Sequence, residues 1–495
     1  MEALLTEEQK RVVETPGSLL VIAGPGTGKT FTLIKKVKNL LESESPEDVV
    51  VLSYSLKVSR ELKEKFSKEG LDSVKVDTFH GFAYDIWRDY YQKNPPLISE
   101  DEKRDILKKL FPRQKSPLKT KEGLKAYRTF LKEKGLLDFE LLLLETIPIL
   151  KHLSLPKFLV IDEFQDMGEE ILEFLKGFPS SNFVFFGDPN QAIYSFKGVD
   201  LLRIRDFLEG IPDLKRLHLT KSFRCREEIL KVAEKFKESP WKVPSYKPLV
   251  SGGSVEGFEL ETPYQEADFL AKKVKELIGG LQLEEQRLSD VAPGDIFILS
   301  RIRQAAAHVR EVFEDQGIPV NSVEAQAEEL KKEIEGFLKN MENPLLDAET
   351  AISSAPREVK GLLKNLWELS NRDEEKFKVY LETISLEDLF QVKKEGVNFL
   401  SIHSSKGLEA DYVFLVGAEN GLIPLKLFKD TREDEEKRLL YVAITRAKSA
   451  FYFTSTKRRK IFNFTLKHGT SRYLADLPIT RIKKPPKKPK QVGLF

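Results

Sequence analysis

The chain has 495 residues, of which 41% are hydrophobic and 32% charged, a composition typical of a globular protein with at least two domains. No apolar run reaches the roughly 20 residues that a membrane-spanning helix needs, and the single cysteine, Cys225, excludes an intramolecular disulfide and a cysteine-based metal cluster. The net charge is +2, but residues 481–495 hold six basic residues and no acid, so the rest carries −4. Any nucleic-acid site must therefore be a local groove.

The first 20 residues contain acidic side chains and lack the basic-then-apolar order of a signal peptide. We therefore expect the protein to remain in the cytoplasm. No segment predicts an association with a membrane.

Short apolar, β-rich runs recur along the chain, and each is followed by a polar or glycine-rich turn and then by a helical pattern. The first set of runs lies at residues 18–23, 49–53, 158–161 and 183–186. A second set begins near Arg216 and includes residues 295–300, 398–402, 412–416 and 450–454. This alternation predicts two α/β domains, each with a parallel sheet covered on both faces.

Each set of predicted strands is interrupted by a polar segment with helical spacing. The insertions are residues 84–137 in the first domain and residues 321–394 in the second. The predicted domains are residues 1–83 with 138–215, and residues 216–320 with 395–480. Residues 481–495 are rich in lysine and proline and predict an extended tail.

A glycine-rich turn follows the first predicted strand, in the sequence VIAGPGTGKT at residues 21–30. Glycines let backbone N–H groups approach phosphate oxygens, and the start of the next helix favours negative charge. Lys29 would neutralise the β and γ phosphates of a nucleotide, and Thr30 would ligate Mg²⁺. The predicted loop comprises Ala23, Gly24, Pro25, Gly26, Thr27, Gly28, Lys29 and Thr30. Ala23 replaces the glycine of the strict pattern, and a turn without a ligand is the alternative.

A second motif, FLVIDEFQD at residues 158–166, places two acids at the end of an apolar run. In an open α/β sheet, ligands bind at the carboxyl ends of the strands, where Asp162 and Glu163 would lie. Asp162 is predicted to hold Mg²⁺ together with Thr30, and Glu163 to polarise the attacking water. The alternative is a plain acidic pair at a strand end.

The sequence AGPGTGKT followed by DEFQD resembles the UvrD/Rep/PcrA helicases of superfamily one. The resemblance implies two RecA-like P-loop NTPase domains, each an α/β domain with a small, mainly helical insertion. It also implies an ATP- and Mg²⁺-dependent single-stranded DNA translocase and 3′–5′ DNA helicase in DNA repair, replication or recombination. Single-stranded DNA and forked or tailed duplexes are the expected partners, and no residue excludes RNA.

Further motifs follow in the order of the family and extend to residue 447. The resemblance assigns the nucleotide contacts to Gln9 in LTEEQ (adenine), Gln191 in GDPNQAIYSFKG (γ-phosphate), Phe223 and Arg224 in LTKSFR (adenine and γ-phosphate), Glu409 in HSSKGLE (ribose) and Arg446 in YVAITRA (arginine finger). Phe223 and Ser222 stand where the family usually has tyrosine and asparagine. Stacking on the adenine is expected to survive this change.

The predicted catalytic residues are divided between the two domains. Lys29, Asp162, Glu163 and Gln191 belong to the first, whereas Arg224 and Arg446 belong to the second. ATP is therefore expected to be fully neutralised only when the domains close, and loss of the γ-phosphate lets the cleft reopen.

A translocating motor needs aromatic faces for bases and donors for phosphates. The resemblance places such groups at Tyr54, Lys57, Phe79, His80, Tyr194, Phe196, Lys197, His403 and Lys406, and more loosely at Phe139. Leu56 replaces an expected asparagine. The alternative for the aromatic residues, above all Phe79 and Phe139, is core packing.

The last five residues, QVGLF, resemble peptides that dock on sliding clamps. Gln491 would fix the register, and Leu494 with Phe495 would fill an apolar pocket, so that the tail tethers the motor to a clamp.

Two other interpretations of the function stay open. The chain could be a motor that strips proteins from DNA with little unwinding, because both insertions are short, or a clamp-tethered DNA-binding protein that ATP only regulates.

Overall fold

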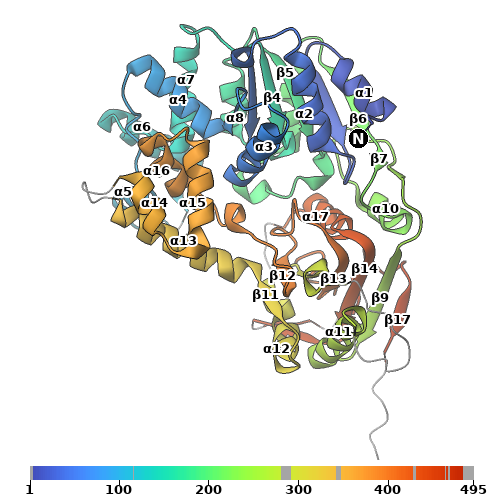
Figure 1. Ribbon diagram of the computed structural model, residues 1–495. Helices are drawn as coiled ribbons and strands as arrows, with labels where there is room; N and C mark the ends of the chain where they lie inside the picture. Colours follow the sequence, from blue (N-terminus) through green and yellow to red (C-terminus); the bar gives the residue numbers. More distant parts are fainter. Residues whose placement is uncertain are drawn as a thin grey trace, which may run out of the picture. The chain divides into compact units, whose positions relative to one another are not determined.

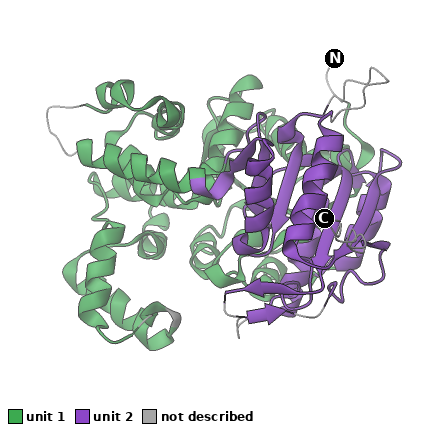
Figure 2. Ribbon diagram, turned by 90° about the horizontal axis from the view of Figure 1, so that it is seen from below, with its two compact units in different colours: residues 1–220, 239–244, 326–390 green, residues 221–238, 245–325, 391–495 purple. Residues whose placement is uncertain are grey.

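The computed structural model of the protein describes residues 4–114, 116–279, 291–341, 347–426, 431–462, 464–466 and 469–482 (Figure 1). The chain divides into two compact units, which Figure 2 shows in two colours. Unit 1 comprises residues 1–220, 239–244 and 326–390, and unit 2 comprises residues 221–238, 245–325 and 391–495. Within the described ranges, no helix combines the length and the apolar character needed to cross a membrane.

A six-stranded parallel sheet forms the centre of unit 1, in the order β3-β2-β4-β5-β1-β6. The strands are β1 (Leu19–Ala23), β2 (Val49–Ser53), β3 (Lys75–Thr78), β4 (Phe158–Asp162), β5 (Asn182–Gly187) and β6 (Lys215–Leu219). β1, β2 and β4 are buried along their whole length, as expected of parallel strands covered on both faces.

The helices of the first 220 residues connect these strands or extend beyond them. They are α1 (Glu7–Glu14), α2 (Lys29–Leu40), α3 (Leu56–Lys68), α4 (Phe79–Tyr91), α5 (Glu100–Leu110), α6 (Lys121–Lys134), α7 (Phe139–Leu150), α8 (Glu169–Leu175) and α9 (Leu201–Glu209). Polar side chains fix several helix starts. Thr6 and Gln9 form a reciprocal capping box at α1, and Asp138 accepts the N–H of Leu141 at the start of α7.

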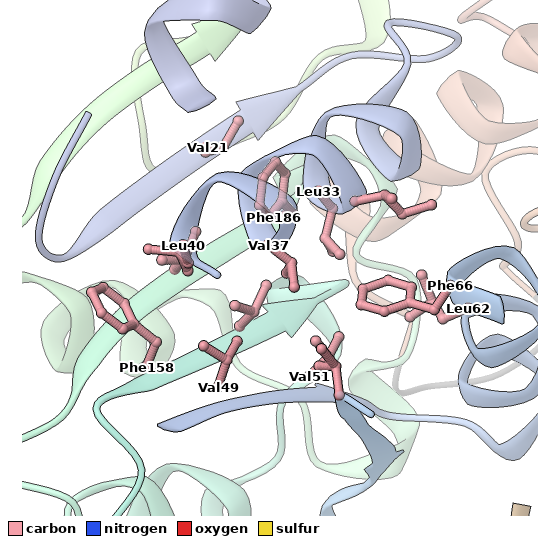
Figure 3. Packing of buried hydrophobic residues seen from close by; sticks show 14 of the residues in the cluster. Val21, Leu33, Val37, Leu40, Val49, Val51, Leu62, Phe66, Phe158 and Phe186 are labelled. Atoms are coloured by element: carbon pink, nitrogen blue, oxygen red, sulfur yellow. The ribbon is translucent and has the colours of Figure 1, made fainter. Parts of the chain in front are cut away.

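The core of unit 1 lies between this sheet and the helices α2 and α3 (Figure 3). Val21 comes from β1, Val51 from β2, Leu33 and Val37 from α2, and Phe66 from α3, and each is at most 1% exposed. Burying an apolar side chain of this size contributes roughly 1.5–3 kcal/mol. Since β1 and α2 share one core, the turn between them is held at both ends.

A helical segment, residues 326–390, interrupts the strands of unit 2 in sequence but packs in unit 1 (Figure 2). Its helices are α13 (Val323–Asn340, which begins just before it), α14 (Ala348–Ser354), α15 (Arg357–Leu369) and α16 (Glu374–Thr383). They share an apolar cluster that also takes in Leu56 of α3. In addition, the buried Lys376 of α16 donates to Asp77 at 2.6 Å and to Asp85 at 2.7 Å.

Unit 2 is built on a seven-stranded sheet in the order β11-β12-β10-β13-β14-β9-β17, in which neighbouring strands are parallel. The strands are β9 (Ser254–Leu260), β10 (Ile296–Ser300), β11 (Val320–Ser322), β12 (Val397–Ser401), β13 (Ala410–Val416), β14 (Ala447–Thr456) and β17 (Ile479–Arg481). The helices of this unit are α10 (Glu227–Ala233), α11 (Pro263–Leu277), α12 (Ala307–Asp315) and α17 (Glu433–Thr445). Two short pairs complete it, namely β7 (Lys221–Ser222) with β8 (Lys247–Pro248) and β15 (Arg459–Ile461) with β16 (Phe464–Leu466).

The predicted fold class, two α/β domains with parallel sheets, is confirmed. Of the predicted domain boundaries, Arg216 lies in β6, which pairs with β1 through Ala23 and Leu219, and Asn321 lies in β11. β6 is an edge strand with a single fully buried residue, so its sequence does not identify the sheet to which it belongs.

Candidate nucleotide and nucleic-acid sites

The phosphate loop lies between the end of β1 at Ala23 and the start of α2 at Lys29. Gly26 and Gly28 have φ angles of 67° and 76°, a left-handed conformation that favours glycine. A Cβ atom on Gly28 would lie 2.8 Å from Nε2 of Gln9, so a larger residue would also displace the end of that side chain. No side chain caps the start of α2. The geometry is therefore that of an anion site formed by backbone N–H groups at a helix N-terminus.

Three charged side chains meet beside this loop. The Lys29 ammonium lies 3.4 Å from Asp162 Oδ1 and donates to Glu163 Oε1. Burial alone would lower the pKa of Lys29, but the charges of Asp162 and Glu163 raise it well above its ordinary value. Burial also raises the pKa of Asp162. The two carboxylates thus hold the ammonium charged and in place at the loop.

The residues present fit a magnesium nucleotide. The hydroxyl of Thr30 and the carboxylate of Asp162 are hard oxygen ligands, which Mg²⁺ prefers, and it usually completes its shell with phosphate and water. In the described part of the chain, no cluster of three or more His, Cys, Asp or Glu side chains forms a closed metal cage. These residues fit an open site, in which Mg²⁺ would be held by the carboxylate of Asp162, the hydroxyl of Thr30 and the phosphates.

A buried relay that the sequence did not single out connects Glu163 with Gln191. Gln165 is 0% exposed, donates to Glu163 Oε2 and accepts the backbone N–H of Asp188 at 3.0 Å. Asp188 in turn accepts the side-chain amide of Gln191 at 3.0 Å. The sequence did contain a signal for Gln165, because it is a polar residue within the DEFQD motif and apolar packing does not explain its presence there. The relay ties the predicted γ-phosphate contact to the predicted base.

Gln9 links α1 to the phosphate loop. Its Oε1 accepts the backbone N–H of Thr6 at 2.9 Å, and its Nε2 donates to the carbonyl of Thr27 at 3.2 Å. The neighbouring Glu8 accepts the N–H and the hydroxyl of Thr220 at 2.7 and 2.6 Å. α1 therefore contacts both the loop and the last residue of unit 1's first segment, a role for Glu8 that the sequence did not indicate.

Two of the predicted nucleotide contacts lie in unit 2, Arg224 and Glu409, and they form an ion pair with each other. Glu409 also pairs with Lys448 at 2.8 Å. Burial would raise the pKa of Glu409, but Arg224 and Lys448 lower it below its ordinary value. The ring of Phe223 is 50% exposed, so its face is accessible for stacking.

Arg446, the predicted arginine finger, follows α17 and is 1% exposed. Its guanidinium donates to the carbonyls of Val442 and Leu408, both at 3.0 Å, and to the hydroxyl of Thr445 at 3.2 Å. Burial, with the nearby charge of Arg224, lowers its pKa to about 10. Arg446 is therefore charged at neutral pH and held close to Arg224.

Three of the predicted strand contacts surround the ammonium group of a fourth, Lys197, in unit 1. Lys197 Nζ lies 4.8 Å from the ring centre of Tyr194 and 6.0 Å from those of Tyr54 and Phe196. The Phe196 ring is 63% exposed, whereas Tyr194 is 9% exposed. Of these rings, Phe196 offers the most accessible face for a base, and Lys197 lies beside it as a cation for a phosphate.

Lys57, also predicted to contact the strand, is bound within unit 1. Its backbone N–H donates to Asp388 Oδ1 at 2.9 Å, and its ammonium donates to the carbonyl of Phe390 at 3.0 Å. Burial lowers its pKa. The side chain thus joins α3 to the end of the helical segment, which the sequence pattern did not reveal.

Phe79 and His80 begin α4 in different environments. Phe79 is 1% exposed and packs in the interior, which favours the core alternative for this residue. The ring of His80 meets that of Phe139 at a centroid distance of 5.9 Å, edge to face. Burial lowers the pKa of His80 to about 4, so the ring is neutral at pH 7 and does not offer a cation to a phosphate.

His403 and Lys406 lie in the turn after β12 in unit 2. Glu324 fixes this turn, because its Oε1 accepts the N–H of Ser401 at 2.7 Å and the hydroxyl of Ser404 at 2.5 Å. The structure therefore places His403 and Lys406 at the carboxyl edge of the second sheet. Gln491, Leu494 and Phe495 lie outside the described residues.

An aromatic surface that the sequence did not indicate lies on the β15–β16 hairpin of unit 2. Phe462 is 54% exposed and Phe464 is 55% exposed. The hairpin is anchored by the buried Arg459, which pairs with Glu266 and Glu419, and by a hydrogen bond of 3.2 Å from the N–H of Phe462 to Gln304. The sequence signal for this surface was the run KRRKIFNF, which combines basic and aromatic residues.

Comparison with known proteins identifies the family. The model of the UvrD/REP helicase N-terminal domain matches residues 5–124 and 97–212, and that of the UvrD-like helicase C-terminal domain matches residues 348–458. The chain belongs to the UvrD/Rep helicase family. These matches contain the phosphate loop, the acidic pair of β4 and Arg446.

Relatives match along most of the chain. A protein of Staphylococcus epidermidis named ATP-dependent DNA helicase PcrA is 22% identical over 635 aligned positions, which cover 96% of this chain and 86% of the relative. Its namesake in Staphylococcus aureus is 23% identical over 644 positions, covering 97% and 87%. An alignment of 635 positions against a chain of 495 residues leaves at least 140 positions without a residue of this chain. The relatives therefore carry extensive segments that this chain lacks.

Proposed function

We propose that the chain is a DNA-dependent ATPase that moves along single-stranded DNA and unwinds duplexes in the 3′–5′ direction. The observation that carries this proposal is the cluster of Lys29, Asp162 and Glu163 at a helix start, next to the carboxyl ends of β1 and β4. Membership of the helicase family supports the substrate class, and the polarity follows from the family resemblance.

Each residue of the cluster has a distinct chemical role in this proposal. A bound magnesium nucleotide supplies the phosphoryl group and its electrophilic centre. The Lys29 ammonium transfers from the carboxylates to the phosphates, which frees Glu163 to accept a proton from water. Gln165 holds the Glu163 carboxylate at a fixed orientation. Arg224 and Arg446 would supply the remaining positive charge to the phosphates.

Two substitutions test the nucleotide site. Lys29→Ala and Glu163→Gln should each abolish DNA-stimulated ATP hydrolysis, and for Glu163→Gln a loss of about 10²–10⁴-fold is expected for removal of a general base. Lys38→Ala is the matched control, because Lys38 lies on the same helix with its side chain 48% exposed. Circular dichroism and unfolding midpoints verify the fold. Normal turnover in either site variant would refute the assignment.

The strand track has its own test. Phe196→Ala should weaken binding of single-stranded DNA by about 1–3 kcal/mol, the usual contribution of a stacked aromatic ring, without altering hydrolysis in the absence of DNA. Tyr90→Ala removes another exposed ring of unit 1, 40% exposed, and serves as the control. Equal affinities of the Phe196 variant and the wild type would mean that this ring does not stack on bases. Strands labelled at either end report the direction of movement.

The shortness of this chain relative to its relatives favours a second candidate function, a motor that strips proteins from DNA with little unwinding. At least 140 positions of the relatives have no counterpart in this chain, and both predicted insertions are short. Comparing the displacement of streptavidin from a biotinylated strand with the unwinding of a forked duplex separates the two. A binding protein that ATP only regulates would show no dependence of ATPase kinetics on strand length.

We further propose that QVGLF docks on a sliding clamp through Leu494 and Phe495. A tether raises the effective concentration of the motor at the clamp and so its processivity. The test titrates a peptide of residues 483–495, and its Leu494→Ala/Phe495→Ala form, against the clamp. Binding by the first peptide only is expected, and equal binding by both contradicts the proposal.

A further inference from the structure

The helical segment of unit 1 ends directly at the predicted strand track. A short 3₁₀ helix, Glu387–Leu389, follows α16. Asp388 accepts the N–H of Lys57, and the carbonyl of Phe390 accepts the ammonium of the same residue. Asp388 is 6% exposed and is bonded in addition to Ser385. The backbone on the C-terminal side of Glu387 is therefore fixed to the first turn of α3.

Glu387 itself contacts the cation of the track. Its Oε1 accepts the Lys197 ammonium at 3.0 Å. The same ammonium lies among the rings of Tyr54, Tyr194 and Phe196. A carboxylate oxygen thus occupies the position beside Lys197 that a phosphate oxygen of a bound strand would take, because both are anionic acceptors of a charge-assisted hydrogen bond.

The ion pair between Lys197 and Glu387 is weak enough for a strand phosphate to replace the carboxylate. The side chains of Lys197 and Glu387 are 28% and 34% exposed, and ion pairs so close to water contribute little to stability. A strand that presents many phosphates can therefore displace the carboxylate. Since Asp388 and Phe390 remain bound to Lys57, Glu387 stays within reach and continues to compete.

We propose that Glu387 sets the affinity of the track by competing with a strand phosphate for Lys197. The inference rests on the proposed function, since it takes Lys197 to be a phosphate contact. Each cycle of release would return the ammonium to Glu387, which keeps it inside the aromatic cage and lowers the residence time of the strand. Neutralising Glu387 should therefore tighten binding.

Equilibrium binding of a fluorescent oligothymidylate to the full chain tests the proposal. Glu387→Gln should tighten binding by about fivefold, because loss of a competing ion pair of about 1 kcal/mol corresponds to that factor. Glu375→Gln is the matched control, since it removes the same charge from the same helical segment, where Glu375 is 53% exposed and pairs with Lys378. The control should change the affinity by less than about 1.5-fold.

Salt dependence distinguishes competition from a general effect of charge. When the strand displaces Glu387, the freed carboxylate takes up a cation and offsets one of those released from the strand. In Glu387→Gln this cation uptake is lost, so the slope of log Kd against log salt should become steeper than in the wild type. A slope equal to that of the wild type would overturn the proposal.

A double substitution traces the effect to Lys197. In a Lys197→Ala background, Glu387→Gln should leave the affinity unchanged. Tightening by the same factor in both backgrounds, or weaker binding by Glu387→Gln alone, would contradict competition. If Lys197→Ala and Phe196→Ala both leave binding intact, the track itself is wrong; if both weaken binding but Glu387→Gln has no effect, only the role of Glu387 is refuted. Unfolding midpoints control for the fold of each variant.

Discussion

Removing the buried ammonium of Lys376 should destabilise unit 1 strongly. Lys376 is 1% exposed and pairs with Asp77 and Asp85, which are 2% and 5% exposed. Asp85 keeps a second cationic partner, Lys75 at 2.7 Å, whereas Asp77 keeps neutral donors such as the hydroxyl of Tyr380. Breaking a buried pair from one side costs about 3–5 kcal/mol. Lys376→Met, which preserves the side-chain volume, should cost about 3 kcal/mol because one aspartate remains paired.

Tryptophan fluorescence during urea unfolding measures this loss for unit 1 alone. The three tryptophans of the chain, Trp87, Trp241 and Trp367, all belong to that unit. Lys378→Met is the control on the same helix, where a 31% exposed lysine pairs with Glu374 and Glu375 and should contribute at most about 0.5 kcal/mol. Equal destabilisation by both substitutions, or less than about 1 kcal/mol for Lys376→Met, would refute the reasoning.

The pH dependence supplies a second arm of the same experiment. Burial would raise the pKa of Asp85, but Lys376 and Lys75 lower it below the ordinary value of 3.8. A carboxyl group with a lowered pKa stabilises the folded state above its unfolded pKa and loses that contribution as the pH falls through the folded value. The difference between wild type and Lys376→Met should therefore be full at pH 7 and shrink below pH 3.8.

Two further predictions concern turnover and acid stability. Arg446→Ala should lower DNA-stimulated turnover by about 10³-fold or more, as loss of an arginine finger does, and a loss below about tenfold would place the finger elsewhere. Its unfolding midpoint must be measured too, since the side chain also donates to Val442 and Leu408. The pKa of His80 falls from 6.5 to about 4 on burial, so the unfolded chain takes up the proton first and stability declines as the pH drops from 6.5 towards 4. At pH 5 this amounts to about 2 kcal/mol relative to pH 7, and His80→Gln should remove that part of the pH dependence in urea unfolding; identical pH profiles would contradict the lowered pKa.

The sequence predicted the parts of the site that depend on local order. The turn between a buried strand and a helix is set by Gly26, Gly28 and Lys29 within a few residues, and Asp162 follows directly from the end of an apolar run. Gln165 was missed although it is adjacent, because its role appears only when β5 brings Asp188 beside it. Local patterns specify an element and its end, but not the neighbours that the sheet order supplies.

The electrostatic environment of the track was beyond the reach of the sequence for the same reason. Lys57 and Lys197 looked like cations available to a strand, but the ammonium of Lys57 donates to the carbonyl of Phe390 and that of Lys197 to Glu387, which lie 333 and 190 residues away. No short-range pattern distinguishes such a lysine from a solvated one.

The attachment of residues 326–390 to unit 1 has a consequence for how that unit is completed. Asp77 and Lys376 are 299 residues apart, so the ammonium that pairs with Asp77 of β3 and with Asp85 of α4 comes from a segment that follows β11 of the other sheet. Residues 1–220 alone contain every strand of the first sheet but leave Asp77 without this cation and α3 without its partner α15. Because loop-closure entropy must be overcome before such distant contacts form, we expect these contacts to form late in folding. The same segment contains Glu387, so its packing in unit 1 also brings a carboxylate to Lys197.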